Sequence, residues 1–265
     1  MSVFLKDYLK INKKISGKRA IVGGGNFSLD LNPDSFLNLF KKKLKVLCKV
    51  LIFFVYEILI AHKFLLKTFK LKNSKKNKIV LILGNGPTQN LLKKNDLFNF
   101  VKNNNDLIVI NYWMLNKKYK RTIPTFYMVS DPKIWYFNEK NFNKVDEDFI
   151  KIRKNYNIAL YKYLKKNKDI NLVINPASIK NAKKILQNNI FSYIDSEARG
   201  LWSKTCPLLP RGYLSSTVLK AISFANWLGY KKIFILGIDS TYPKTFYSNI
   251  KNDILNHEYN ATNYN

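Results

Sequence analysis

The chain has 265 residues, enough for one sizeable core, and Lys and Arg outnumber Asp and Glu by 46 to 17, for a net charge of +29. Three causes commonly produce such a charge: nucleic-acid binding, attraction to an anionic membrane, or compositional drift that fills solvated faces with lysine. Base-specific recognition favours Arg, whereas most basic residues here are Lys, and no zinc-ligand spacing or RNP-like motif occurs. The composition therefore favours drift and membrane attraction, and it argues against nucleic acid as a partner.

The two cysteines, Cys48 and Cys206, lie far apart and give no disulfide framework. The first seven residues lack the apolar core of a signal peptide. We therefore expect a cytoplasmic protein, peripheral to the inner face of the cytoplasmic membrane.

A strongly apolar stretch runs from about residue 40 to residue 72. Lys49, Glu57 and Lys63 fall inside the window of about 20 residues that a spanning helix needs, so spanning is disfavoured. On a helical wheel, Leu, Ile and Phe fill most of the surface and one stripe is largely basic. This stripe comprises Lys45, Lys49, Tyr56, Lys63, Lys67 and Lys70. The pattern predicts a basic amphipathic helix in an anionic membrane interface or, alternatively, a long helix packed on the domain with its lysines in water.

Residues 72–78 have the composition of a linker, so we expect an N-terminal segment of residues 1–77 and a main domain of residues 78–265. Within the first segment, residues 19–29 form another apolar run with a Gly-rich turn. They are open to interpretation as a second strand, a degenerate repeat or an alternative nucleotide loop.

The main domain is organised around the apolar run Ile79–Leu83, which leads directly into Gly84-Asn85-Gly86-Pro87-Thr88. A continuous aliphatic run ended by glycines predicts a central strand covered on both faces. The glycines lack the Cβ atoms that would keep a phosphate from the backbone. We expect Thr88 to cap a helix through about Asn103, whose first amides favour an anion. The alternative is a turn that only closes a βα unit.

Further buried strands are predicted over residues 107–110, 125–129, 172–174 and 232–239. Asn111 follows the first of these strands, and Ser130 and Asp131 follow the second. Because ligands bind at the carboxyl ends of parallel strands, we expect these residues and the glycine turn to converge on one crevice. There Asp131 could bind a ribose hydroxyl or a metal. Each residue has an alternative role as a strand-end cap or Asx turn.

Helical patterns complete the predicted fold. Residues 133–168 look like a helical region beside the site, and residues 176–187 form another helix. The clearest helix runs from Ser216 to about Leu228; Ser215, Ser216 and Thr217 start it, and Gly229 ends it. Its first amides could serve the same anion. We therefore expect an α/β, Rossmann-like, mostly parallel sheet with helices on both faces, plus an N-terminal basic amphipathic helical segment.

These motifs resemble the bacterial sialyltransferases of glycosyltransferase family forty-two and, more loosely, the motility-accessory-factor glycosyltransferases. The likeness covers roughly residues 78–250. It rests on Gly84-Asn85-Gly86-Pro87 after a strand, Asn111 after the next and Ser215-Ser216 opening a helix. Its most specific part is the stretch from Leu228 to Asp239, which ends Leu-Gly-Ile-Asp.

The resemblance implies an inverting, metal-independent glycosyltransferase without a cofactor. It would transfer sialic acid or a related nonulosonate from a CMP-activated donor to a surface glycan or lipid-linked acceptor. In this family two tyrosine hydroxyls bind the departing phosphate and a histidine deprotonates the acceptor, and Tyr242, Tyr247 and His257 are the candidates here. Arg211 and Asp239 complete the implied donor-binding set.

Two departures from the family keep alternatives open. Asp131 stands where the family has an Asn, and His257 follows Asp239 more closely than the family base does. Either the acceptor lid is reduced or the natural protein continues beyond Asn265. The alternatives are a transferase that uses another nucleotide- or phosphate-activated donor with a metal at Asp131, and a non-catalytic nucleotide- and membrane-binding module.

Overall fold

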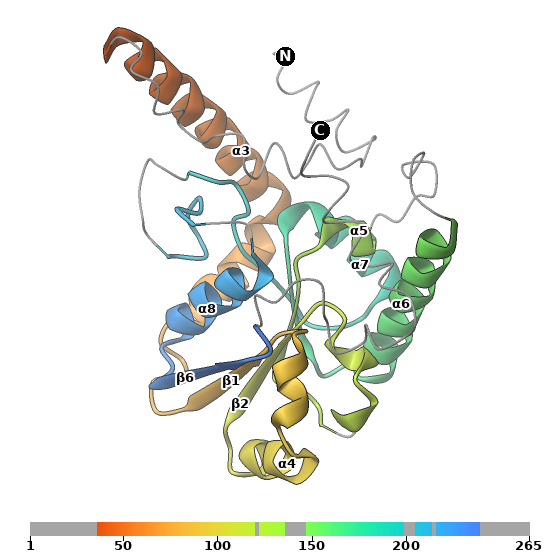
Figure 1. Cartoon of the computed structure of the whole chain (residues 1–265). Coiled ribbons are helices and arrows are strands. Elements are labelled where there is room, and N and C mark those ends of the chain that lie inside the picture. The colour runs from red at the N-terminus through yellow and green to blue at the C-terminus, as the bar shows by residue number, and fades with distance from the viewer. Residues whose placement is uncertain (1–35, 120–121, 136–146, 199–204, 214–215, 239–265) are drawn as a thin grey trace.

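The fold is an α/β arrangement built on a six-stranded, all-parallel, Rossmann-like sheet with the strand order β5-β4-β3-β2-β1-β6 (Figure 1). The computed structural model describes residues 36–119, 122–135, 147–198, 205–213 and 216–238. The strands are β1 (Ile79–Leu83), β2 (Asp106–Ile110), β3 (Phe126–Val129), β4 (Asn171–Ile174), β5 (Ile190–Ser192) and β6 (Lys232–Leu236). The α-helices are α3 (Phe36–Lys70), α4 (Lys94–Lys102), α5 (Pro132–Trp135), α6 (Glu147–Lys166), α7 (Ile179–Ile185) and α8 (Thr217–Leu228). The sequence-based prediction of a parallel α/β sheet is thus confirmed.

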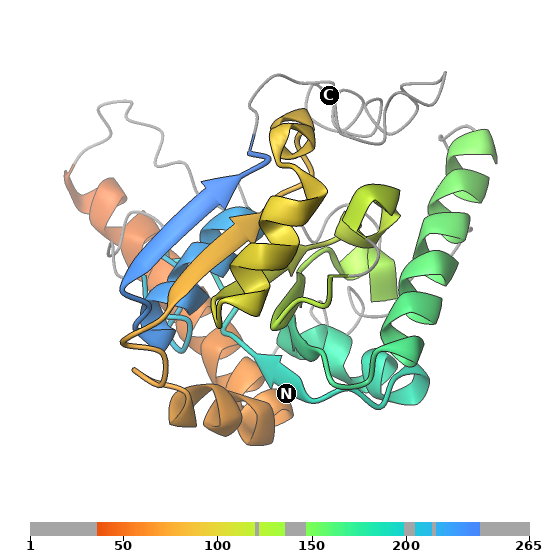
Figure 2. The same ribbon diagram turned by 90° about the horizontal axis from the view of Figure 1, so that it is seen from below.

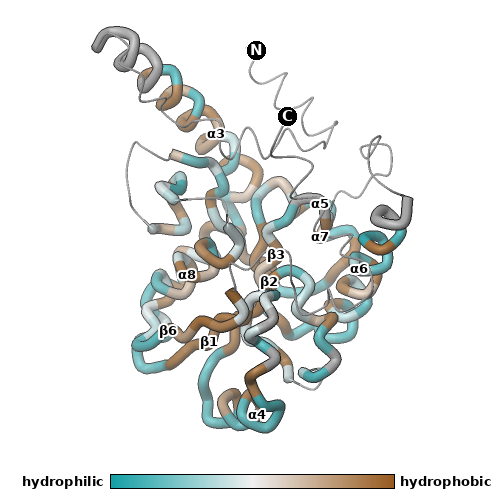
Figure 3. Tube along the Cα trace, in the orientation of Figure 1, coloured by the Kyte–Doolittle hydropathy of each residue, from teal (hydrophilic) through white to brown (hydrophobic). Residues whose placement is uncertain are grey.

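Two apolar cores cover the two faces of the sheet. Leu81 and Leu83 of β1 join the core that includes Leu97 of α4 and residues of α6 and α7. Val80 and Ile82 join the core on the other face, which includes Phe224 of α8. Figure 2 shows α4 and α8 on opposite sides of β1, and Figure 3 shows the apolar character of the strands between them. Burial on both faces explains why the strands appear in the sequence as continuous aliphatic runs.

The long helix α3 packs against the edge strand β5. The Thr68 hydroxyl donates to the carbonyl of Ser192 at 2.7 Å. Glu57 is buried, and its carboxylate accepts hydrogen bonds from the backbone amides of Asp195 and Ser196, at 3.1 and 3.0 Å. The predicted helix is confirmed, and one of its faces packs on the domain. Glu57, which counted against a spanning helix, fastens α3 to the chain that follows β5.

The prediction that an α-helix begins at Thr88 is wrong. The glycine turn leads into a 3-10 helix, Pro87–Leu91, and the α-helix begins only at Lys94. The Tyr119 hydroxyl lies 2.6 Å from the Gln89 carbonyl oxygen and 2.7 Å from that of Leu92. Because this hydroxyl meets the carbonyls that a continuous helix would pair with its own amides, the helical hydrogen-bond pattern is interrupted there.

The prediction of a buried strand over residues 232–239 is also wrong, in the end of the strand and in its burial. It ends at Leu236 and lies at the edge of the sheet, where Phe234 is 51% and Ile235 is 42% exposed. Gly237 has a φ of 75°, which ends the extended backbone. An apolar run does not distinguish a central strand from an edge strand, because that depends on its neighbours in the sheet.

Buried tyrosines should make the fold sensitive to alkali. Burial raises the pKa of Tyr119, Tyr161 and Tyr163 from 10.0 to about 12. A raised pKa favours the protonated phenol in the folded state, so this stability is complete below about pH 10 and is lost as the pH rises toward 12. Urea unfolding monitored by circular dichroism should therefore show a midpoint that falls above pH 10.

A matched pair of Tyr→Phe variants tests whether the tyrosines cause this loss. The Tyr163 hydroxyl is buried without a hydrogen-bond partner among the described residues, so Tyr163→Phe should leave stability at neutral pH unchanged or raise it by up to about 1 kcal/mol. The alkaline loss should also become shallower. The Tyr230 hydroxyl donates to Asp106 at 2.8 Å, so Tyr230→Phe should cost about 1–3 kcal/mol. A larger loss of stability in Tyr163→Phe than in Tyr230→Phe would contradict the hydrogen bonding assigned to the two hydroxyls.

Candidate functional site

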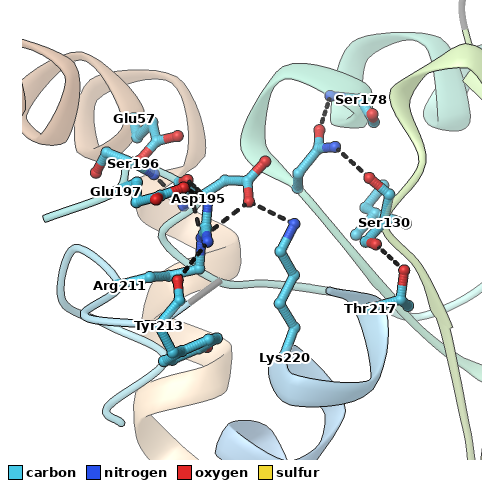
Figure 4. Close-up of polar contacts among 12 residues, drawn as sticks. Glu57, Ser130, Ser178, Asp195, Ser196, Glu197, Arg211, Tyr213, Thr217 and Lys220 are labelled. Carbon is cyan, nitrogen blue, oxygen red and sulfur yellow. Dashed lines mark hydrogen bonds and ion pairs between the residues drawn. The ribbon is translucent and has the colours of Figure 1, made fainter. Parts of the chain in front are cut away.

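Three separate segments meet at the carboxyl edge of the sheet. Asn111 follows β2, Ser130 follows β3, and Thr217 is the first residue of α8. The Asn111 side-chain amide donates to the Thr217 hydroxyl at 3.2 Å, and the hydroxyls of Ser130 and Thr217 lie 2.5 Å apart. Figure 4 shows the contact between Ser130 and Thr217. The ends of β2 and β3 thus meet the start of α8, as predicted, whereas the predicted convergence of the glycine turn with these residues stays a prediction.

The local backbone presents the Asn111 side chain. Asn111 has a φ of 45°, a left-handed conformation that Asn tolerates better than most residues. Its backbone amide donates to the Met128 carbonyl at 2.9 Å, and its backbone carbonyl accepts from the Tyr127 hydroxyl at 2.7 Å. With its backbone groups bonded to β3, Asn111 directs its side-chain amide toward the start of α8.

The glycine turn lies between the ends of β1 and β6. Gly84 donates its amide to the Leu236 carbonyl at 2.8 Å, and Gly86 donates to the Gly237 carbonyl at 2.7 Å. A Cβ on Gly84 would overlap the Gly237 carbonyl oxygen. The Thr88 hydroxyl accepts from the Gly237 amide at 3.1 Å. Gly84 and Thr88 thus connect the end of β1 to the end of β6. This contact is a structural reason for the glycine motif that does not involve a ligand.

The side chain between the two glycines lies at the sheet position where ligands bind most often. The chain moves from β1 through β2 to β5 in one direction and then returns to place β6 on the other side of β1. This reversal is the topological switch point of a parallel α/β sheet. The side-chain oxygen of Asn85 is buried there and has no hydrogen-bond partner among the described residues. Asn85 thus places a buried polar group at the switch point.

Asp131 forms a partly buried ion pair beside this edge. Its carboxylate meets the Arg153 guanidinium of α6, and that guanidinium lies 5.9 Å from the centre of the Tyr112 ring. The positive charge of Arg153 offsets the negative charge of the Asp131 carboxylate. Within the described ranges, no group of three or more His, Cys, Asp or Glu side chains has a metal-binding arrangement.

A buried charged cluster that the sequence did not predict holds the chain after β5 against α8 (Figure 4). Arg211 is 1% exposed and donates to the carbonyls of Asp195 and Tyr213, at 3.0–3.1 Å, and pairs with Glu197 at 3.4 Å. The Lys220 ammonium group lies 2.6 Å from the Asp195 carboxylate. Burial lowers the pKa of Lys220, and the Asp195 carboxylate opposes that shift. Arg211 was predicted to bind the sugar-nucleotide donor. In the structure its guanidinium N–H groups bond to groups of the protein itself.

Asn175 is a second residue that the prediction missed. It follows β4, donates to the Ser130 carbonyl at 3.2 Å, and accepts from the Ser178 amide at 2.9 Å. The signal was the same as for Asn111, an Asn directly after an apolar run. Asn175 therefore fixes the backbone that carries Ser130.

The remaining predicted residues lie at element ends or outside the described ranges. Ser216 is the N-cap of α8, with extended backbone and no side-chain capping hydrogen bond. Pro87 opens the 3-10 helix after the glycine turn. Residues outside the described ranges are Ser215, Asp239, Tyr242, Tyr247, His257 and the segment 19–29.

No protein-family model matches the chain, and no curated protein matches it. None of the helices in the described part combines the length and apolarity needed to cross a membrane. The fold and the edge cluster define the class: a parallel α/β protein with a polar cluster at the carboxyl edge of its sheet.

Proposed function

We propose that the protein is a glycosyltransferase that transfers sialic acid or a related acidic sugar from a CMP-activated donor, with inversion and without a metal. The observation that carries this proposal is the hydrogen-bonded meeting of Asn111, Ser130 and Thr217. It brings the start of α8 to two strand ends. Parallel sheets commonly bind nucleotides at this edge, and the sequence resemblance supplies the donor class.

In the proposed reaction, an acceptor hydroxyl oxygen attacks the anomeric carbon while the bond from that carbon to the CMP phosphate breaks. His257 takes the acceptor proton, and the phosphate leaves with the bonding electron pair. Tyr242, Tyr247 and the first amides of α8 stabilise its negative charge, which needs no metal. Asn111 and Ser130 orient the beginning of that helix through Thr217.

Two other polar groups fit this role. The Asn85 side chain lies at the switch point between β1 and β6, a position where nucleotides bind in parallel sheets. The Arg153 guanidinium neutralises Asp131, which reduces its repulsion of a nucleotide phosphate. We also propose that the acceptor is lipid-linked and that the protein works at the surface of an anionic membrane.

A Thr217→Val variant tests the donor site. Valine keeps the side-chain shape but removes the hydroxyl shared by Asn111 and Ser130, so CMP affinity in isothermal titration should fall about tenfold. Thr125→Val is the matched control, because Thr125 bonds Asp106 at the opposite, amino edge. It should leave CMP affinity unchanged. Equal affinities for both variants would contradict the donor site.

Turnover tests the catalytic assignments. With CMP-sialic acid and a sugar acceptor, CMP release should fall at least about 100-fold in Tyr247→Phe and in His257→Ala. CMP affinity in His257→Ala should stay close to wild type, because the base contacts the acceptor. Turnover unchanged in both variants would remove these roles. CMP binding without turnover would instead favour a non-catalytic module, and loss of activity in EDTA would favour the metal-dependent alternative.

A further inference from the structure

Helix α3 extends past the carboxyl edge of the sheet. Lys67, near its end, donates to Asn189 just before β5 at 2.8 Å, whereas Glu57 meets the chain just after β5. The helix therefore runs antiparallel to β5. At about 1.5 Å of rise per residue, the part before Glu57 reaches about 30 Å beyond that anchor. Figure 1 shows this part of α3 projecting from the body of the fold.

The surface of α3 divides into three stripes at 100° per residue. The buried stripe faces the domain and comprises Val50, Glu57, Ala61, Leu65 and Thr68. The lysine stripe comprises Lys45, Lys49, Lys63, Lys67 and Lys70. The outer apolar stripe comprises Leu44, Leu51, Val55, Ile58, Leu59, Leu66 and Phe69, which are 38–69% exposed. The lysine and outer apolar stripes adjoin each other on the side of the helix away from the buried stripe. At the last turn, Lys67 and Phe69 also contact the domain, at Asn189 and Trp227.

From Leu44 to Leu66 the outer apolar stripe is exposed, and only at its end does the ring of Phe69 lie 6.3 Å from that of Trp227 of α8 among the described contacts. Single exposed apolar side chains are common, but a continuous row along a helix marks a contact surface. The adjoining lysines decide the partner, because their charge complements an anionic surface and the whole chain carries +29. A helix with this division binds with its apolar side chains among lipid headgroups and its lysines at the phosphates.

We propose that the outer apolar stripe of α3 docks into the surface of an anionic lipid bilayer, with the lysine stripe on the lipid phosphates. The carboxyl edge of the sheet then lies on the side of the domain toward which the docked helix extends. This orientation deepens the proposed function and rests on it, because it holds the candidate donor site beside a lipid-linked acceptor. The docking itself needs only the residues of α3.

The anchor at Glu57 makes the orientation definite. Its carboxylate bonds the amides of Asp195 and Ser196, and Asp195 in turn pairs with Lys220 of α8. Helix α8 also carries Thr217 at the candidate site. A bilayer that holds α3 therefore holds α8 and the sheet edge through buried polar contacts rather than through a flexible tether.

A fluorophore on Cys48 reports docking directly. Cys48 is exposed and lies within the outer apolar stripe, and Cys206→Ser leaves it as the single cysteine. An environment-sensitive label should shift to the blue with vesicles that contain phosphatidylglycerol, and much less with phosphatidylcholine alone. The matched control carries the label at Asn155→Cys, on an exposed position of α6, in a cysteine-free background. Equal shifts at both positions, or none at Cys48, would overturn the proposal.

Variants separate specific docking from general charge attraction. Leu51→Glu with Leu59→Glu should weaken vesicle flotation at least about tenfold. A triple variant with Lys45→Gln, Lys63→Gln and Lys70→Gln should weaken it by about fivefold for each lysine removed. The control changes Lys162, Lys165 and Lys166 of α6 to Gln, which removes the same charge elsewhere. Equal losses from the two lysine sets would overturn the assignment to α3.

The remaining outcomes are also decisive. Circular dichroism melts should confirm that the variants fold, because the altered side chains are exposed. If the protein self-associates through Leu51 and Leu59 and does not bind vesicles, the stripe is an interface between two copies and the proposal fails. CMP titration without vesicles separates the two hypotheses: lost vesicle binding with intact CMP affinity overturns the docking alone. Failure to bind CMP in a vesicle-binding protein overturns the donor site alone.

Discussion

Replacing Gly84 with alanine is expected to lower the free energy of unfolding by about 3 kcal/mol or more. The new Cβ would overlap the Gly237 carbonyl oxygen and lie 2.9 Å from its carbonyl carbon. Both groups belong to the backbone, so relief requires β1 and β6 to separate. That separation would break the hydrogen bonds from Gly84 to Leu236 and from Gly86 to Gly237. Urea unfolding at neutral pH measures the loss.

Hydrogen exchange and a control variant localise this effect. The amides of Gly84 and Gly86 should lose protection in Gly84→Ala, and CMP affinity should fall because the turn shifts. Ser74→Ala, in the exposed turn before β1, should change stability by less than about 0.5 kcal/mol. A Gly84→Ala protein with wild-type stability would show that the two strand ends are not in close backbone contact.

Removing the charge of Asp195 should be the other severe change. Asp195→Asn leaves the Lys220 ammonium, which is 4% exposed, without the carboxylate 2.6 Å away. Arg211 also loses a carboxylate at 3.4 Å. Because an uncompensated buried charge is far more costly than a missing pair, we expect a loss of about 3–5 kcal/mol in the free energy of unfolding.

A double-mutant cycle separates the pair from its surroundings. Lys220→Met should cost less than Asp195→Asn, because Asp195 keeps Arg211 as a partner. The double variant should be more stable than Asp195→Asn alone, with an interaction energy of about 2 kcal/mol. Urea unfolding of the four proteins gives this energy. Strictly additive losses would show that Lys220 and Asp195 do not interact in solution.

Elements with local sequence signals were predictable without knowledge of the fold. The aliphatic runs that became β1 to β4 and the helix α8 were predicted within a few residues. Gly229, predicted to end α8, has a φ of 80°. Burial on both faces requires continuous apolar residues, and a left-handed helix end favours glycine, so both features are encoded in single short segments.

Part of the candidate site was equally predictable. Asn111 and Ser130 follow apolar strands, and Thr217 opens a helix, so the rule for parallel sheets was enough to bring them together. Asp195 and Lys220 were not predicted. Lys220 is one of many lysines in the chain, and nothing in its local sequence distinguishes a buried ammonium group from a solvated one.

Which segments are neighbours depends on long-range contacts, which no local sequence pattern reveals. β5 has three residues, too few for a periodic signal, and it is held by Thr68, far away in the sequence. The edge position of β6 depends on its pairing with β1, and the buried stripe of α3 depends on Glu57 reaching the amides after β5. These features arise from contacts between residues distant in the chain. Their energies belong to pairs that no single segment contains.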